Sequence, residues 1–135
     1  MAARPSQTNV PSVAALVLVD DDPALLHAMS FAFETEGYLV HAFADAESLL
    51  AHADARHSAV CFVLNQRLPG MTGLTLLAKL RAEGIEAPAI LITFNPPAAV
   101  GREAYAAGVD IVEKPLLDGI LATKVREAVS GVRAN

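Results

Sequence analysis

Four short apolar stretches of the sequence each lead into polar side chains that could do chemistry. ALVLV is followed by three acids, CFVL by an amide, ILI by a hydroxyl, and IVE by an ammonium group. In chain order these side chains are Asp20, Asp21, Asp22, Asn65, Thr93 and Lys114. Carboxylates can bind cations or act as nucleophiles, and hydroxyl and ammonium groups donate hydrogen bonds to anions. Together they predict one polar site drawn from four parts of the chain.

The apolar runs before these residues indicate how they are brought together. Five runs alternate with helical patterns, and they are Ala15–Val19, Tyr38–Ala42, Val60–Leu64, Ala89–Ile92 and Ile111–Val112. Such alternation indicates parallel βαβ units with helices on both faces of the sheet. Ligands of open α/β sheets bind outside the carboxyl ends of the strands. We therefore expect one doubly wound α/β domain with the polar residues at one edge.

The helical patterns between the runs have recognisable ends. The first has Pro23 in its first turn, Gly37 as its stop, and one apolar face. That face comprises Leu25, Ala28, Met29, Ala32 and Phe33. Asp45 is expected to cap a second helix that continues through Ser48–Ala53. The third pattern carries Leu74, Leu77 and Ala78 and ends at Gly84. The fourth pattern covers Ala98–Ala107. The fifth pattern carries Leu117, Ile120, Leu121, Val125 and Ala128.

Composition excludes several classes of protein. Hydrophobic residues make up 53% of the 135 residues and charged residues 19%, which argues against a disordered chain. No apolar run is long enough to span a membrane. The single cysteine, Cys61, excludes a disulfide framework and suits the reduced cytoplasm, where we expect the protein. A net charge of −5 without a basic cluster gives little support for nucleic-acid binding.

We expect one domain over residues 14–130. Residues 1–13, rich in Pro, Ser, Asn and Gln, are predicted to be a disordered leader, and residues 131–135 a tail. The sequence lacks paired cysteines, a nucleotide-binding glycine loop and a Ser-His-Asp order, so nothing in it indicates an enzyme.

Four motifs in order resemble the receiver domain of two-component response regulators, the CheY-like family. They are VLVDDDP, LPGMTGLTLLAKLR, ILIT and AGVDIVEKP, and the resemblance extends from about Ala15 to Val129. It implies a flavodoxin-like five-stranded parallel sheet in the order 2-1-3-4-5.

The resemblance also implies roles for the polar residues. Asp20 and Asp21 match an acidic pair that holds Mg²⁺, and the backbone carbonyl of Arg67 matches a further ligand. Thr93 and Lys114 match the groups that contact the phosphoryl oxygens. Pro115 matches a position where the family usually has a cis peptide bond.

At the phospho-acceptor position of the family this sequence has Asn65 instead of a carboxylate. A carboxylate can attack phosphorus, but an amide cannot, because its nitrogen lone pair is delocalised and its oxygen is neutral. We therefore expect no acyl phosphate at this residue. The loss of one charge from three should also weaken Mg²⁺ binding, so no cofactor is expected to be required and weak Mg²⁺ binding remains open.

Two further positions depart from the resemblance. Phe94 stands where the family usually has a small residue that leaves room for the phosphoryl group. Ile111 stands where the family usually has an aromatic residue that rotates on activation. Together they favour the loss of the conformational switch, whereas Leu116, where an aromatic is also common, is interpreted as core packing. We expect Asn95, Pro96 and Pro97 to stiffen the following loop.

These observations predict a stand-alone, atypical receiver, or pseudo-receiver, that acts by protein–protein binding. Its expected partner is a histidine kinase, bound near Leu26 and His27, or another response regulator. A homodimer through the fourth helix, last strand and fifth helix is a further expectation. Two alternatives stay open: a conventional phosphorelay receiver that uses Asp20 or Asp21, and a small-molecule sensor that uses the vacated pocket.

Overall fold

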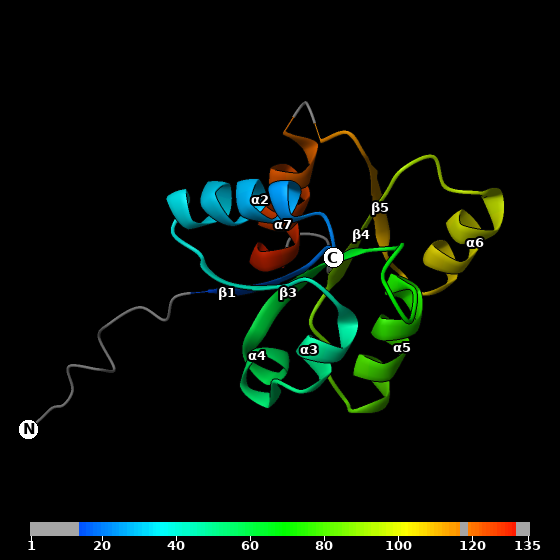
Figure 1. Ribbon diagram of the computed structural model, residues 1–135, viewed down its shortest axis with the longest axis horizontal. Helices are drawn as coiled ribbons and strands as arrows, with labels where there is room; N and C mark the ends of the chain where they lie inside the picture. The colour runs from blue at the N-terminus through cyan, green and yellow to red at the C-terminus, as the bar shows by residue number, and fades with distance from the viewer. Residues whose placement is uncertain (1–13, 117–118, 132–135) are drawn as a thin grey trace, which may run out of the picture.

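The computed structural model describes residues 14–116 and 119–131 and contains one five-stranded parallel sheet (Figure 1). The strands are β1 (Ala15–Val19), β2 (Leu39–Phe43), β3 (Ala59–Asn65), β4 (Ala89–Thr93) and β5 (Asp110–Glu113). Their order in the sheet is β2-β1-β3-β4-β5, with all neighbours parallel. The predicted doubly wound, flavodoxin-like fold is therefore confirmed.

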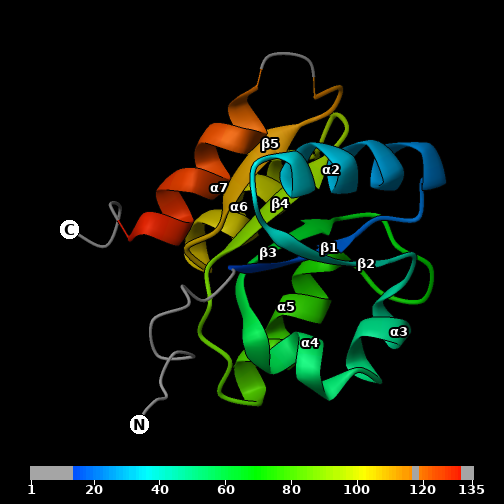
Figure 2. The same ribbon diagram turned by 90° about the vertical axis from the view of Figure 1, so that its left-hand side faces the viewer.

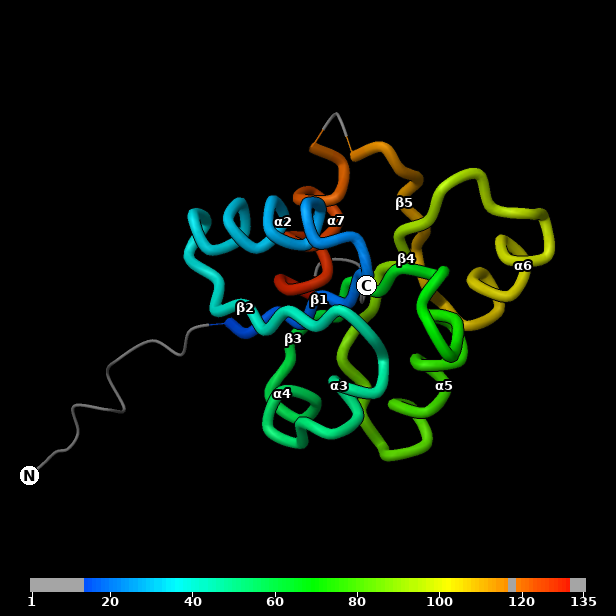
Figure 3. Tube along the Cα trace, viewed as in Figure 1, coloured from blue at the N-terminus to red at the C-terminus, as the bar shows by residue number. Residues whose placement is uncertain are grey.

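Helices cover both faces of this sheet. They are α2 (Pro23–Thr35), α3 (Ala46–Leu50), α4 (Ala53–Ser58), α5 (Gly73–Ala82), α6 (Ala98–Ala106) and α7 (Ile120–Ser130). Helices α2 and α7 lie together on one face, and α3, α4 and α5 lie on the other (Figure 2). Helix α6 stands at the β4–β5 end of the sheet (Figure 3). This layering leaves the central strands buried on both sides.

The two faces carry separate cores because side chains of a strand alternate between them. In β3, Phe62 and Leu64 face the core beneath α3, α4 and α5, whereas Cys61 and Val63 face α2 and α7. All four are buried. Cys61 is thus a core residue.

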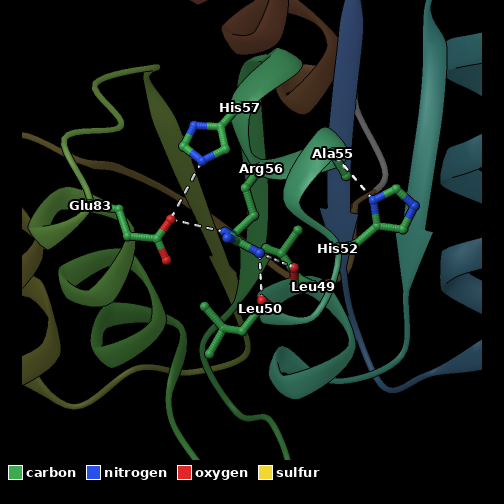
Figure 4. Close-up of polar contacts among 7 residues, drawn as sticks. All are labelled: Leu49, Leu50, His52, Ala55, Arg56, His57 and Glu83. Atoms are coloured by element: carbon green, nitrogen blue, oxygen red, sulfur yellow. Dashed lines mark hydrogen bonds and ion pairs between the residues drawn. The ribbon is translucent and has the colours of Figure 1, made fainter.

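The predicted second helix is wrong in one respect, since the chain forms two short helices where one was expected. Helix α3 ends at Leu50, and α4 begins at Ala53. The side chain of His52 ends the continuity, because its Nδ1 accepts a hydrogen bond from Ala55 N at 3.1 Å and caps α4 (Figure 4). Asp45 caps α3 as predicted, through Ser48 N at 2.7 Å.

The predicted apolar face of the first helix is only partly buried. Met29 and Phe33 are buried and Leu25 is half-buried, but Ala28 and Ala32 are exposed. Because these two side chains are short, they do not reach α7. They border an apolar groove of about 190 Å³ between α2 and α7 instead. Of the fifth helical pattern, Leu121, Val125 and Ala128 are buried, whereas Ile120 is exposed. Leu117 lies outside the described residues.

The limits of β1 agree with prediction and those of the other strands differ by at most one residue, so that β3 includes Asn65 itself. The predicted leader (1–13) and most of the predicted tail lie outside the described residues. Among the residues described, no helix is both long and apolar enough to cross a membrane.

Candidate functional site

A hollow of about 250 Å³ lies at the carboxyl edge of the sheet, where β1, β3, β4 and β5 end. Its lining residues are Asp21, Asn65, Arg67, Thr93, Phe94 and Lys114. The fold thus brings together side chains that are separated by up to 93 positions in the chain, counted from Asp21 to Lys114. The prediction that the four strand ends form one polar site agrees with this arrangement.

Asp20 lies beneath the hollow and is paired with Lys114. Its carboxylate is fully buried, and Oδ2 lies 3.0 Å from Lys114 Nζ. Although this distance defines an ion pair, the geometry at Oδ2 is not that of a hydrogen bond. The other oxygen, Oδ1, accepts a bond from Asp22 N at 2.9 Å. Asp20 is therefore stabilised from two sides by groups of the protein itself.

Asp22 has a different role from its two neighbours. Its side chain accepts hydrogen bonds from Ala24 N at 3.1 Å and Leu25 N at 3.3 Å and so caps α2. This cap fixes the first turn of α2 directly after Asp20 and Asp21. Asp22 is therefore a helix-terminus residue and does not line the hollow.

Asn65 is the last residue of β3 and is almost fully buried. Its Nδ2 donates to the backbone carbonyl of Arg67 at 2.6 Å and, over a longer distance of 3.4 Å, to Asp21 Oδ1. Both partners are oxygen acceptors, so they favour the orientation that points the amide nitrogen toward them. The Asn65 side chain consequently joins the end of β1 to the loop after β3.

Two residues that the sequence analysis did not single out hold this loop in place. Gln66 donates its backbone N–H to Ile92 O at 2.9 Å, and its Oε1 accepts from Leu74 N at 3.0 Å. Gly73, at the start of α5, packs so closely that a Cβ there would lie 2.6 Å from Asn65 O. A glycine at a helix start, one residue after the capping Thr72, was the available signal for this contact.

The β4 and β5 ends are joined by backbone pairing. Thr93 is buried, and its carbonyl accepts a bond from Lys114 N at 2.7 Å. The Lys114–Pro115 peptide bond is cis, as the family resemblance implied. Lys114 and Pro115 also line a second hollow of about 390 Å³, which shares Phe94 with the first.

Phe94 and Ile111 lie in different environments. Phe94 is 67% exposed and forms a wall between the two hollows, so it does not fill the first. Ile111 is half-buried and packs against the core beneath α5, away from the hollow. Leu116 packs against the α2 and α7 core, which agrees with its interpretation as a packing residue. The structure therefore brings Phe94 to the site but not Ile111.

The arrangement as it stands does not fit Mg²⁺. The family resemblance would place the ion among Asp20, Asp21, a carboxylate at position 65 and the Arg67 carbonyl. Here Asn65 turns its nitrogen toward Asp21 and Arg67, and Asp20 is paired with Lys114. In residues 14–116 and 119–131, no group of three or more His, Cys, Asp and Glu side chains could hold a metal ion.

Comparison with protein families identifies the class of the chain. The model of the response regulator receiver domain matches residues 16–126. The protein belongs to this family. The match includes all four strand ends that form the hollow.

Curated relatives agree with this assignment. The transcriptional regulatory protein FixJ of Bradyrhizobium diazoefficiens is 30% identical over 115 residues, which cover 84% of this chain and 56% of that protein. The two-component response regulator PhoP of Pseudomonas aeruginosa is 34% identical over 101 residues, covering 74% of this chain and 44% of that protein. The chain spans about half the length of the curated relatives it matches.

Solved structures show the same fold. A CheY-like receiver domain protein from Methanospirillum hungatei superposes with a TM-score of 0.80 at 26% identity and covers 91% of this chain and 98% of its own. The structure described as FixJ-N gives a TM-score of 0.77 at 28% identity and covers 89% of this chain and 96% of its own.

Proposed function

We propose that this member of the receiver family transmits signals by binding other proteins, without forming an acyl phosphate at the end of β3. The observation that carries the proposal is the buried carboxamide of Asn65 in the lining of the hollow. An amide is not a nucleophile toward phosphorus. On this proposal the chain is not an enzyme and works in the cytoplasm as an atypical two-component regulator.

The alternative acceptors are Asp20 and Asp21, and their environments differ. Asp20 is fully buried and ion-paired, which leaves its oxygens inaccessible to a phosphodonor. Asp21 is exposed and lines the hollow, so it is the carboxylate that a phosphodonor could reach. Asp21 is therefore the residue to control in any phosphorylation experiment.

Incubation with a small phosphodonor such as acetyl phosphate, followed by intact-mass measurement, tests the proposal. We expect no added phosphoryl mass on the wild-type chain and a labile phosphoryl adduct on Asn65→Asp. The Asp21→Asn variant is the control for labelling at the alternative carboxylate. An adduct on wild type that disappears in Asp21→Asn would refute the proposal in favour of a conventional receiver.

The surface of α2 supports a histidine kinase or another response regulator as partner. Between Pro23 and Phe33 the helix has no Asp, Glu, Lys or Arg, and it exposes Phe31 to 68%. A shallow groove beside it is lined by Pro23, Leu26, His27, Ser30 and Ala42. An uncharged surface with an exposed aromatic is typical of the centre of a protein interface.

A second surface, formed by α6, β5 and α7, is proposed for homodimers. It exposes Tyr105 to 89% on α6. Phe31→Ser and Tyr105→Ser form a matched pair, because each removes one exposed aromatic from one surface. Loss of kinase binding only in Phe31→Ser, and a shift from dimer to monomer in light scattering only in Tyr105→Ser, are the expected results.

A further inference from the structure

The hydrogen bonds of Asn65 suggest a function for the amide beyond the absence of an acceptor carboxylate. Its nitrogen donates to Arg67 O at 2.6 Å and lies 3.4 Å from Asp21 Oδ1. These atoms are a backbone oxygen and a carboxylate oxygen, which are the kinds of ligand that a hard cation takes. The amide N–H groups thus occupy the position between two oxygens that a cation would otherwise bridge.

We propose that the Asn65 carboxamide replaces a divalent cation as the cross-link of the pocket, so that the domain is held together at this edge without metal. The inference rests on the proposed function in so far as both concern Asn65. It adds that the site is closed to Mg²⁺ and held in a single arrangement by the protein's own donors.

The charges of the pocket are compatible with this arrangement. Two carboxylates, Asp20 and Asp21, face two cationic side chains, Lys114 and Arg67, so the formal charges of the pocket cancel. Asp20 receives the ion pair from Lys114 and a bond from Asp22 N, and Asp21 receives the amide of Asn65. Each carboxylate therefore has a partner within the protein.

Binding of a cation would require this network to break. The amide would have to turn so that its oxygen, not its nitrogen, faced Asp21 and Arg67, and the short bond to Arg67 O would be lost. The loop cannot simply move aside, because Gln66 and Gly73 hold it through bonds to Ile92 O, Leu74 N and Gln66 O. Arg67 is also paired with Thr72 in an isolated bridge. After this rearrangement the cation would gain only a neutral amide oxygen as ligand, where a carboxylate would supply a charged one.

The test compares wild type with Asn65→Asp, which restores a carboxylate and removes the donor. Unfolding temperatures are measured in chelator and in millimolar Mg²⁺, and Mn²⁺ is used as a paramagnetic probe of the amide signals around Arg67. We expect no Mg²⁺ shift and no local Mn²⁺ broadening in wild type. We expect Asn65→Asp to unfold at a lower temperature in chelator, to recover with Mg²⁺, and to bind it at least about tenfold more tightly.

The variant Asn65→Leu provides a second measurement that does not depend on metal. It keeps the branched arrangement of four side-chain heavy atoms and removes the N–H donors. We expect amide hydrogens between Gln66 and Gly73 to exchange at least about tenfold faster than in wild type. Unchanged exchange in Asn65→Leu, or Mg²⁺ affinity of wild type within tenfold of Asn65→Asp, overturns the inference.

These results are separable from those that bear on phosphorylation. A phosphoryl adduct on the wild-type chain contradicts the proposed function. Cation binding, unfolding temperature and hydrogen exchange concern the cross-link alone. Wild type that binds Mg²⁺ tightly but gains no phosphoryl mass would therefore overturn only the cross-link.

Discussion

Lys114 Nζ lies 3.0 Å from Oδ2 of Asp20, a carboxylate with no exposed surface, and the two residues join the end of β1 to the end of β5. The pair spans nearly the whole described sequence and connects strands that are not neighbours in the sheet. A buried ion pair adds little net stability by itself, but the loss of one partner leaves a buried charge uncompensated. The pair therefore makes the stability of the pocket depend on both residues.

We expect Lys114→Met to destabilise the domain by about 3–5 kcal/mol, because Asp20 would remain buried without a counter-charge. Urea unfolding followed by circular dichroism measures the change. The double variant Asp20→Asn with Lys114→Met should regain part of the loss. Lys124→Met is the matched control, since Lys124 forms a longer, half-exposed pair with Asp110 at 3.7 Å and should cost less than about 1 kcal/mol.

Two glycines at helical positions should respond oppositely to alanine. In Gly73→Ala the new Cβ would meet Asn65 O at 2.6 Å and Leu91 Cδ1 at 2.9 Å, which we expect to cost about 1–3 kcal/mol. Gly101, within α6, has open space around the same position, so Gly101→Ala should stabilise by about 0.5–1 kcal/mol. Thermal unfolding of the two variants checks the signs. Equal changes of the unfolding temperature in the two variants would mean that the backbone near Asn65 can shift to make room for the new Cβ.

Arg56 joins three helices of one face (Figure 4). Its Nε donates to Glu83 Oε1 at 3.0 Å at the end of α5, and its Nη1 donates to the carbonyls of Leu49 and Leu50 at the end of α3. The side chain is only 13% exposed. Arg56→Met should therefore destabilise by about 1–3 kcal/mol, because the α3 carbonyls lose their donor.

The neighbouring His57 provides the control for Arg56. It is 57% exposed and reaches the same Glu83 oxygen only at 3.7 Å. Substitution of His57 by Ala should change the free energy of unfolding by less than about 0.5 kcal/mol. Urea titrations of both variants at neutral pH distinguish the two side chains.

Acid should weaken the cap of α3. Hydrogen bonds from the backbone N–H and then the side chain of Ser48 hold the pKa of Asp45 below its ordinary value of 3.8. A carboxyl with a lowered pKa in the folded state contributes stability above its unfolded pKa and loses it as pH falls through the folded pKa. We expect this contribution to decline progressively as the pH falls below about 4.

The Asp45→Asn variant keeps a capping oxygen and has no charge to lose. Its stability should therefore vary less with pH than that of wild type in the acidic range. Unfolding temperatures between neutral pH and pH 3, about one unit below the ordinary pKa, measure the difference. Parallel curves for the two proteins would contradict the assignment of the cap.

The site residues could be found from the sequence because their positions depend on local patterns. Each follows an apolar run, and the carboxyl ends of parallel strands must meet at one edge of a sheet. The types of the residues Asp20, Asn65, Thr93 and Lys114 therefore predicted both the place of the site and the chemistry that Asn65 excludes. The strand order followed from the family resemblance.

The second helix shows where local patterns were insufficient. The expected helix continued through Ser48–Ala53, but the imidazole of His52 accepts a hydrogen bond from Ala55 N and starts a new helix. Arg56 then satisfies the carbonyls that α3 leaves free at its end. Such competition of a side chain with the backbone is not recorded by hydrophobic periodicity, and the His52 ring also contacts His41 and Phe43 of β2.

The sequence by itself determined the fold class, the edge at which the polar residues meet, and the presence of an amide, not a carboxylate, at position 65. Only the tertiary structure decided what Asn65 does instead. Its contacts with Arg67 O and Asp21 depend on how Gln66 and Gly73 place the loop after β3. The physical reason is that a residue type sets which hydrogen bonds are available, whereas their direction is set by groups that are distant in the chain and adjacent in space.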